Sequence, residues 1–144
     1  MAVHPYSAIA DYNLFQEPSH SPEHSIMPDG KICYIEIPAT DVDSSAKFYA
    51  DVFAWKSRTR GDGSRAFDDT TGAVSGTWVL GRKPQRESTM LTYIMVDSID
   101  ATLKKIAKAG GRVATPNTPL GAAGAYATFH DPAGNLLGLY QEPG

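Results

Sequence analysis

Residues 37–49 read IPATDVDSSAKFY and residues 94–106 read IMVDSIDATLKKI, so one pattern occurs twice at a displacement of 57 positions, 94 − 37. In both copies an apolar, strand-like run ends and a short polar stretch follows. An aspartate then comes directly after a β-branched residue, Val42 in the first copy and Ile99 in the second. A repeat of this size is one supersecondary module that cannot bury its apolar face alone. We therefore expect two modules that cover each other, with the binding site between them.

A second correspondence lies near the end of each module. Residues 74–78, VSGTW, match residues 136–140, LLGLY, at a displacement of 62, 136 − 74. We assign the increase from 57 to 62 to the connections, above all to the Pro- and Gly-rich stretch 115–124, because insertions collect in loops. This loop is expected to overhang the site.

Composition indicates a soluble globular protein. The chain of 144 residues has 42% hydrophobic and 20% charged residues, a formal net charge of −3 and the single cysteine Cys33. These values disfavour nucleic acid and anionic membranes as partners, and one cysteine excludes an intrachain disulfide. No stretch resembles a secretory signal or a membrane span, so we expect a cytoplasmic location.

Residues 1–30 differ from the rest of the chain. They hold four prolines and three of the four histidines and show no sustained period of 2 or 3.6. We expect an N-terminal arm that is extended or partly disordered, followed by a single domain over residues 31–144. His20 and His24 have the spacing of a helical metal pair, but Pro22 between them disfavours the helix, so a solvated tail is preferred.

The hydrophobic periodicity predicts the order βαβββ in each module, over about 31–82 and 88–141. In the first strand the alternation puts Tyr34 and Glu36 on one face and two isoleucines on the other. The predicted elements are strand 32–37, a helix capped by Asp41 or Asp43, strands 55–60, 65–70, 76–80 and 89–96, a helix capped by Ser98, and strands 112–114, 126–130 and 136–140.

Three motifs accompany this order: D-x-D-x-S-x-K-F-Y at 41–49, V-F-x-W at 52–55 and D-P-x-G-N at 131–135. Together, over about residues 31–141, they resemble the vicinal oxygen chelate superfamily of glyoxalase I, bleomycin-resistance proteins and ring-cleaving dioxygenases. The resemblance implies an α+β fold in which two tandem βαβββ modules form a curved mixed sheet around a central cavity. It also implies a homodimer.

The same resemblance implies where a divalent metal would be held. Members of this superfamily place His, Gln or Glu at equivalent positions of the two modules, which here are Tyr34, Gly76, Leu91 and Gly138. Glycine and leucine carry no donor atom, and one phenol does not make a metal site. We therefore predict no metal at this place and no other cofactor, which puts the usual glyoxalase and dioxygenase activities in doubt.

Strand alternation also predicts the cavity wall. It is rich in aromatic side chains with few ionisable groups, and this suits an aromatic or conjugated organic molecule better than a phosphate. The predicted substrate-binding residues are Arg60, Trp78, Leu91, Tyr93, Met95, Tyr126 and Tyr140.

Three side chains are candidates for catalysis. Glu36 is a possible acid or base because it is a carboxylate in an otherwise apolar strand, although an arginine partner would give it a structural role. Tyr34 and His130 are candidates for stabilising developing oxyanion charge. Their structural alternatives are pocket lining for Tyr34 and a solvent-exposed turn for His130.

Functions of different classes remain open. The first is a metal-independent enzyme that isomerises, dehydrates or cyclises a small organic substrate by acid–base catalysis, which a single Glu in an aromatic pocket favours. The second is a non-catalytic protein that binds or sequesters a ligand, as resistance-type relatives do. The third is a metal-dependent lyase or dioxygenase with displaced ligands. Replacing Glu36 by Gln separates the first two, because only an enzyme has turnover to lose.

Overall fold

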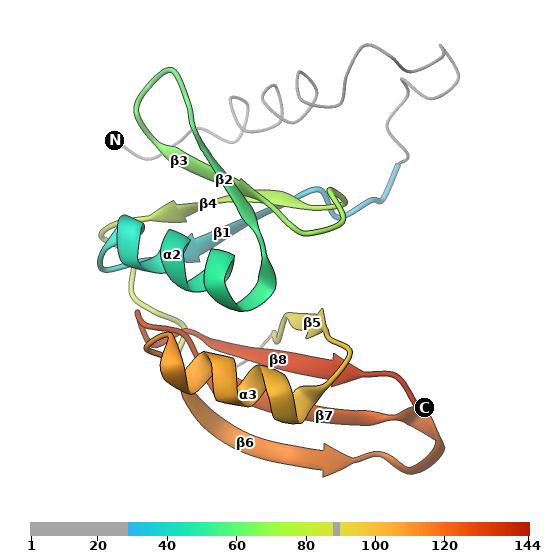
Figure 1. The fold of residues 1–144 in the computed structure, drawn as a ribbon. Coiled ribbons are helices and arrows are strands. Elements are labelled where there is room, and N and C mark those ends of the chain that lie inside the picture. Colours follow the sequence, from blue (N-terminus) through green and yellow to red (C-terminus); the bar gives the residue numbers. More distant parts are fainter. Residues whose placement is uncertain (1–28, 88–89) are drawn as a thin grey trace.

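The computed structural model describes residues 29–87 and 90–144, which form two βαβββ modules (Figure 1). Nearly all of the predicted N-terminal arm lies outside these residues. The first module contains β1 (Tyr34–Pro38), α2 (Val42–Phe53), β2 (Lys56–Thr59), β3 (Arg65–Asp68) and β4 (Ser75–Val79). The second contains β5 (Tyr93–Met95), α3 (Ile99–Lys108), β6 (Arg112–Pro119), the short 3-10 helix η2 (Gly121–Ala123), β7 (Ala125–His130) and β8 (Leu136–Gln141).

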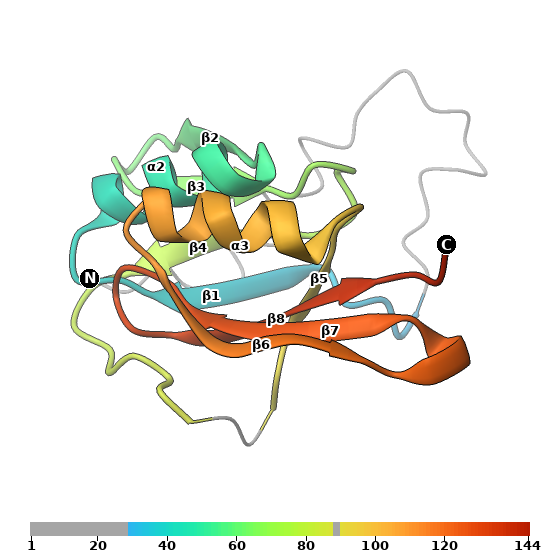
Figure 2. The same ribbon diagram turned by 60° about the horizontal axis from the view of Figure 1, so that its bottom comes forward.

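Each module forms its own four-stranded mixed sheet, with strand order β1-β4-β3-β2 in the first and β5-β8-β7-β6 in the second. The first strand of each module pairs in parallel with the last, and the other pairs are antiparallel. Helices α2 and α3 lie next to each other (Figure 2). The predicted two-module α+β fold is therefore confirmed, with two sheets that do not close into one.

The two helices begin with the same capping device. The side chain of Asp41 accepts a hydrogen bond from the backbone N–H of Ser44 at 2.9 Å, and Ser98 accepts one from Ala101 at 3.1 Å. Each bond satisfies one of the N–H groups that a first helical turn leaves without a partner. Among the described residues, neither helix has the length and hydrophobicity needed to cross a bilayer.

A single apolar core joins the modules. Phe48 and Tyr49 of α2 are at most 1% exposed. The Phe48 ring lies 6.1 Å from that of Phe129 in the second module, and the Tyr49 ring stacks on Trp55 at 4.6 Å. Since the helix of one module packs on a strand of the other, the two repeats cover each other as the sequence predicts.

The D-P-x-G-N turn adds a polar link between the modules. The carboxylate of Asp131 accepts hydrogen bonds from the Tyr49 hydroxyl at 2.9 Å and from the backbone of Gly134 and Asn135 at 3.0 and 2.8 Å. The side-chain amide of Asn135 donates to the carbonyl of Pro38 in β1 at 2.7 Å. The motif therefore fixes how the first module sits on the second.

The corresponding turn of the first module is one residue longer. The N–H of Asp69 donates to the carbonyl of Val74, five residues on (74 − 69), whereas that of Asp131 donates to Asn135, four residues on (135 − 131). A one-residue difference exchanges the two faces of the strand that follows. The displacement of 62 is therefore one residue too long for the last strands, and 61 aligns them.

The long connection of the second module is partly a strand. β6 continues to Pro119, through the stretch predicted as a loop from residue 115, with register shifts on either side of Thr115. β6 is the edge strand of its sheet, where a proline is tolerated because one side of the strand needs no ladder hydrogen bond. Composition alone therefore predicted a loop where the sheet edge accepts a strand.

Candidate functional site

The face of the second sheet that is turned away from α3 carries four large side chains from three strands. Register pairs Tyr93 of β5 with Gly138 of β8, Met95 with Tyr140, and Tyr126 of β7 with Tyr140. In-register residues share a face, so these side chains lie together. The residues that alternate with them on β7 and β8 are buried in the core: Ala127, Phe129, Leu137 and Leu139.

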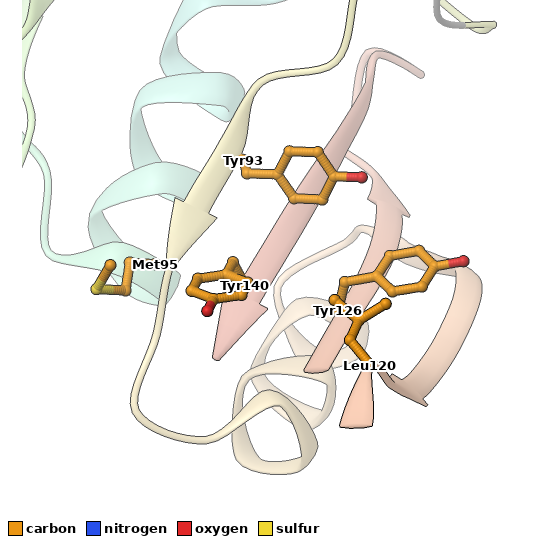
Figure 3. Close-up of a pocket in the computed structure, with 5 residues that line it drawn as sticks. All are labelled: Tyr93, Met95, Leu120, Tyr126 and Tyr140. Carbon is orange, nitrogen blue, oxygen red and sulfur yellow. The ribbon is translucent and has the colours of Figure 1, made fainter. Parts of the chain in front are cut away.

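These four side chains and one from the connection after β6 line an open pocket of about 460 Å³ (Figure 3). The lining residues are Tyr93, Met95, Leu120, Tyr126 and Tyr140. None of the five carries a charge. The volume and the apolar lining are typical of a site for a small organic molecule.

The ring of Tyr93 lies against the backbone of Gly138, and in Figure 3 it projects from β5 across β8. A Cβ atom placed on Gly138 would be 2.4 Å from Cδ1 and 2.5 Å from Cε1 of that ring. The ring therefore fills the space that any side chain at position 138 would need. It forms the floor of the pocket at this point.

The three tyrosine hydroxyls of the pocket differ in their partners. Tyr140 donates its hydroxyl hydrogen to the carbonyl oxygen of Ala123 at 2.7 Å, which holds η2 beside the pocket. The hydroxyls of Tyr93 and Tyr126 make no hydrogen bond to a described residue, and both point the same way in Figure 3. Tyr140 therefore contributes its ring, whereas the other two contribute a ring and a hydroxyl.

The corresponding face of the first sheet is polar. Arg60 donates a hydrogen bond from Nη2 to the Tyr34 hydroxyl, and its guanidinium carbon lies 5.6 Å from the centroid of that ring. Nearby in the same sheet, Asp68 accepts hydrogen bonds from the Ser75 hydroxyl at 2.6 Å and from Nε of Arg58 at 3.3 Å. The predicted residues Tyr34 and Arg60 thus contact each other, but away from the aromatic pocket.

Glu36 lies outside the aromatic pocket. Its carboxylate forms an ion pair with Nη1 of Arg82 at 2.9 Å. It lines a separate cavity of about 90 Å³ between β1 and the second module. The arginine partner anticipated as the structural alternative for Glu36 is therefore present.

His130 and Leu91 are also outside the aromatic pocket. His130 follows Tyr126 by four residues on β7, and its Nε2 lies 3.4 Å from the carbonyl oxygen of Arg86. Its Nδ1 is buried and has no hydrogen-bond partner within residues 29–87 and 90–144. Leu91 is half-buried and precedes β5.

Trp78 packs in the core and does not line the aromatic pocket, which corrects its predicted place; it borders a separate hollow beside the start of α2. It is in register with Ile37 and is 4% exposed. Its ring centroid lies 4.8 Å from that of Phe67 and 6.1 Å from that of Tyr49. The cause is the longer turn of the first module, which gives Trp78 the opposite facing from Tyr140.

The structure therefore brings four predicted ligand-binding residues together and adds Leu120. Sequence reasoning missed Leu120 because it lies in the stretch assigned to a loop. A signal was present, since Leu120 is the only large apolar residue between 115 and 124. An isolated large apolar residue in a loop that overhangs a pocket is a candidate for its wall.

The residues at the expected metal positions do not fit a bound metal. Gly76 and Gly138 have no donor atoms, and the Tyr93 ring fills the space beside Gly138. Gly76 faces the core, where a Cβ would lie 2.3 Å from Cζ of Phe67. The displacement of 61 makes Thr77 the residue equivalent to Gly138, 138 − 61, and its hydroxyl donates a hydrogen bond to the carbonyl of Arg65 at 2.6 Å. Across the described part of the chain, no three His, Cys, Asp or Glu side chains converge. The metal content of the protein stays a prediction.

Comparison with known proteins identifies a family model for most of the chain. Residues 31–139 match the model described as Glyoxalase/Bleomycin resistance protein/Dioxygenase superfamily. A glyoxylase-like domain-containing protein of Didymella fabae is 32% identical over an alignment of 123 positions, and the match covers 80% of this chain and 96% of that protein. A protein of Mycobacterium bovis described as a glyoxylase, CFP32, is 28% identical over 127 residues. The match covers 83% of this chain but 49% of CFP32, so the chain spans about half the length of that relative.

Solved structures share the fold at low sequence identity. A family enzyme from Burkholderia phytofirmans has a TM-score of 0.66 at 17% identity, covering 79% of this chain and all (100%) of that one. The fosfomycin resistance protein FosX of Listeria monocytogenes has a TM-score of 0.67 at 18% identity, covering 81% of this chain and 94% of that one.

Proposed function

The chain belongs to the glyoxalase/bleomycin resistance protein/dioxygenase superfamily, and from that premise we propose that it binds an aromatic or conjugated organic molecule in the aromatic pocket of its second module. The observation that carries the proposal is a wall of three tyrosines, a methionine and a leucine around about 460 Å³. Tyrosine rings give a flat ligand a large contact area, and methionine adapts to its outline.

Binding without turnover is the function that this geometry favours. General acid–base catalysis needs a proton carrier within hydrogen-bond reach of the substrate. The lining offers tyrosine hydroxyls but no carboxylate, imidazole or amine, while Glu36 is paired with Arg82 and His130 contacts the carbonyl of Arg86. Likeness in fold to a fosfomycin resistance protein supports a role in handling a small molecule, and no substrate is carried over from it.

A second candidate is a metal-independent acid–base enzyme. Its site would be the polar face of the first sheet, which carries Tyr34 and Glu36. The contact between Arg60 and Tyr34 favours it, because a guanidinium that donates to a phenol oxygen stabilises developing negative charge there. Glu36 lies on the same face of β1, two residues after Tyr34. Proton transfer between these groups and a substrate suits isomerisation, dehydration or cyclisation.

The test is a ligand screen followed by two matched variants. Planar organic compounds are screened by thermal shift, and the affinities of the hits are measured by calorimetry. Tyr126→Ala removes one wall of the aromatic pocket, whereas Tyr34→Ala removes the same side chain from the other sheet. We expect Tyr126→Ala to weaken binding at least about tenfold and Tyr34→Ala to change it less than about twofold. The reverse result favours the second candidate.

A further inference from the structure

The floor of the aromatic pocket is a ring rather than a polar group. Tyr93 occupies the space beside Gly138 that a side chain would otherwise fill, and its ring atoms come within 2.4 Å of a Cβ placed there. A ring held against a sheet presents its open face to the pocket. A flat surface of this kind favours stacking of a flat molecule.

No group in the pocket compensates a charge. The five lining side chains include no Lys, Arg, His, Asp or Glu. An ion that enters such a site loses part of its hydration without gaining a group of opposite charge, which is costly. A cation could be held by several ring faces that surround it, but here the Tyr93 ring is laid against Gly138 and forms one side only.

Two hydroxyls are available at the edge of the floor. Those of Tyr93 and Tyr126 point the same way in Figure 3 and bond to no described residue, whereas that of Tyr140 is engaged by Ala123 at 2.7 Å. A phenol can donate one hydrogen bond and accept others. The hydroxyl of Tyr126 can therefore recognise a polar substituent on one edge of a ligand, whereas that of Tyr93 lies in the plane of the ring on which the ligand stacks.

From these features, and resting on the proposed function, we propose that the ligand is an uncharged, fused-ring or similarly planar compound with a hydroxyl or carbonyl group on one edge. Its ring system stacks on Tyr93, and its oxygen substituent bonds to the hydroxyl of Tyr126. Gly138 determines this specificity, because any other residue at this position would place a side chain in the space that the Tyr93 ring fills.

Four probes of one size test the ligand class: 2-naphthol, naphthalene, naphthalene-2-sulfonate and N-methylquinolinium. Their affinities are measured by calorimetry on the full chain at neutral pH. We expect 2-naphthol to bind about threefold to tenfold more tightly than naphthalene, which is the effect of one hydrogen bond. Both ions should bind at least about tenfold more weakly than 2-naphthol.

Variants test the residues. Tyr126→Phe should lower the affinity for 2-naphthol to about that for naphthalene and leave the affinity for naphthalene unchanged, whereas Tyr140→Phe, its control, should keep the difference. Gly138→Ala should lower the affinities for 2-naphthol and for naphthalene alike, by roughly tenfold, because the Tyr93 ring must move into the pocket. Gly61→Ala is the matched control, since a Cβ there has no neighbour within 4 Å.

The outcomes separate the two proposals. If no probe binds, the proposed function fails and the ligand class fails with it. If naphthalene binds but the ions bind as tightly, or N-methylquinolinium binds most tightly, the pocket stands and the uncharged class is overturned. If Tyr126→Phe keeps the preference for 2-naphthol, the role of the Tyr126 hydroxyl is overturned.

Discussion

The hydroxyl of Tyr49 donates a hydrogen bond to Oδ2 of Asp131 at 2.9 Å, across 82 positions of the chain. The first residue lies on the helix of one module and the second at the turn between the last two strands of the other. Both are buried, and Asn135 donates to the same carboxylate oxygen at 2.9 Å. The buried carboxylate thus has several donors and ties the two repeats together.

Tyr49→Phe should destabilise the fold by about 1–2 kcal/mol, because it removes one donor from a buried carboxylate and leaves the ring packing in place. Asp131 keeps its bonds to Gly134 and Asn135, so the fold should persist. Urea unfolding followed by far-UV circular dichroism measures the change. Tyr126→Phe, at a pocket hydroxyl with no described partner, is the control and should shift stability by less than about 0.5 kcal/mol.

The stability of the fold should also fall at alkaline pH because of Tyr49. Burial, and then the charge and hydrogen bond of Asp131, raise the pKa of Tyr49 well above its ordinary value of 10.0. Below pH 10 both the folded and the unfolded state keep the hydroxyl proton of Tyr49. Between pH 10 and the raised pKa, only the folded state keeps it. The free energy of unfolding therefore falls above about pH 10, by at most about 1.4 kcal/mol per pH unit from this group.

The comparison with Tyr49→Phe isolates that contribution, because the other tyrosines are present in both proteins. The difference in unfolding free energy between the wild type and the variant should shrink as pH rises from about 9 to 11. A difference that stays constant over this range would show that Tyr49 does not titrate differently in the two states.

The order of elements could be predicted because the repeat and the amphipathic patterns are local properties of the chain. The face of the sheet on which Trp78 lies could not be predicted. It depends on whether the turn after Asp69 spans four or five residues, and both lengths fit the sequence DDTTGAV at 68–74. Because strand side chains alternate with period 2, this one residue decides whether Trp78 lies in the core or in a cavity.

The aromatic pocket could be predicted in part, because the alternation of side chains along a strand is also a local property of the chain. Tyr93, Met95 and Tyr140 lie on strands whose core-facing neighbours are plainly apolar, so alternation places them correctly. The partner of Glu36 could not be predicted, because Arg82 follows the last strand of the module and its position depends on the path of a connection. Contacts made by connections follow from tertiary geometry rather than from periodicity.

The purified protein should hold no stoichiometric divalent metal at the position expected from the superfamily. Leu91 and Gly138 supply no side-chain donor, which leaves at most Tyr34 and Thr77, and a competent site needs three or more protein ligands. Elemental analysis after mild dialysis measures the content. Near one Zn, Ni, Mn or Fe per chain would contradict the prediction and would assign the ligands to other residues.

The protein should form a homodimer at micromolar concentration. Met90 and Ile32 are 83% and 73% exposed, and a second copy that covered these large apolar side chains would remove them from water. A formal net charge of −3 gives little repulsion between copies. Sedimentation equilibrium should give twice the mass of the chain, and a clean monomer would refute the expectation.

Glu36→Gln should leave the affinity of the aromatic pocket for a planar ligand within about twofold, because Glu36 is paired with Arg82 and lines a different cavity. If the second candidate function holds instead, the same change should lower turnover by roughly two to four orders of magnitude, since it removes the proton carrier and preserves its shape.

Arg82→Gln is the matched control, because it breaks the same ion pair and keeps the carboxylate. Loss of turnover in Glu36→Gln alone identifies an acid–base role for Glu36, whereas equal losses in both variants identify a structural role for the pair. Unchanged binding in both variants, with no turnover in the wild type, is the result expected of a protein that binds its ligand in the second module.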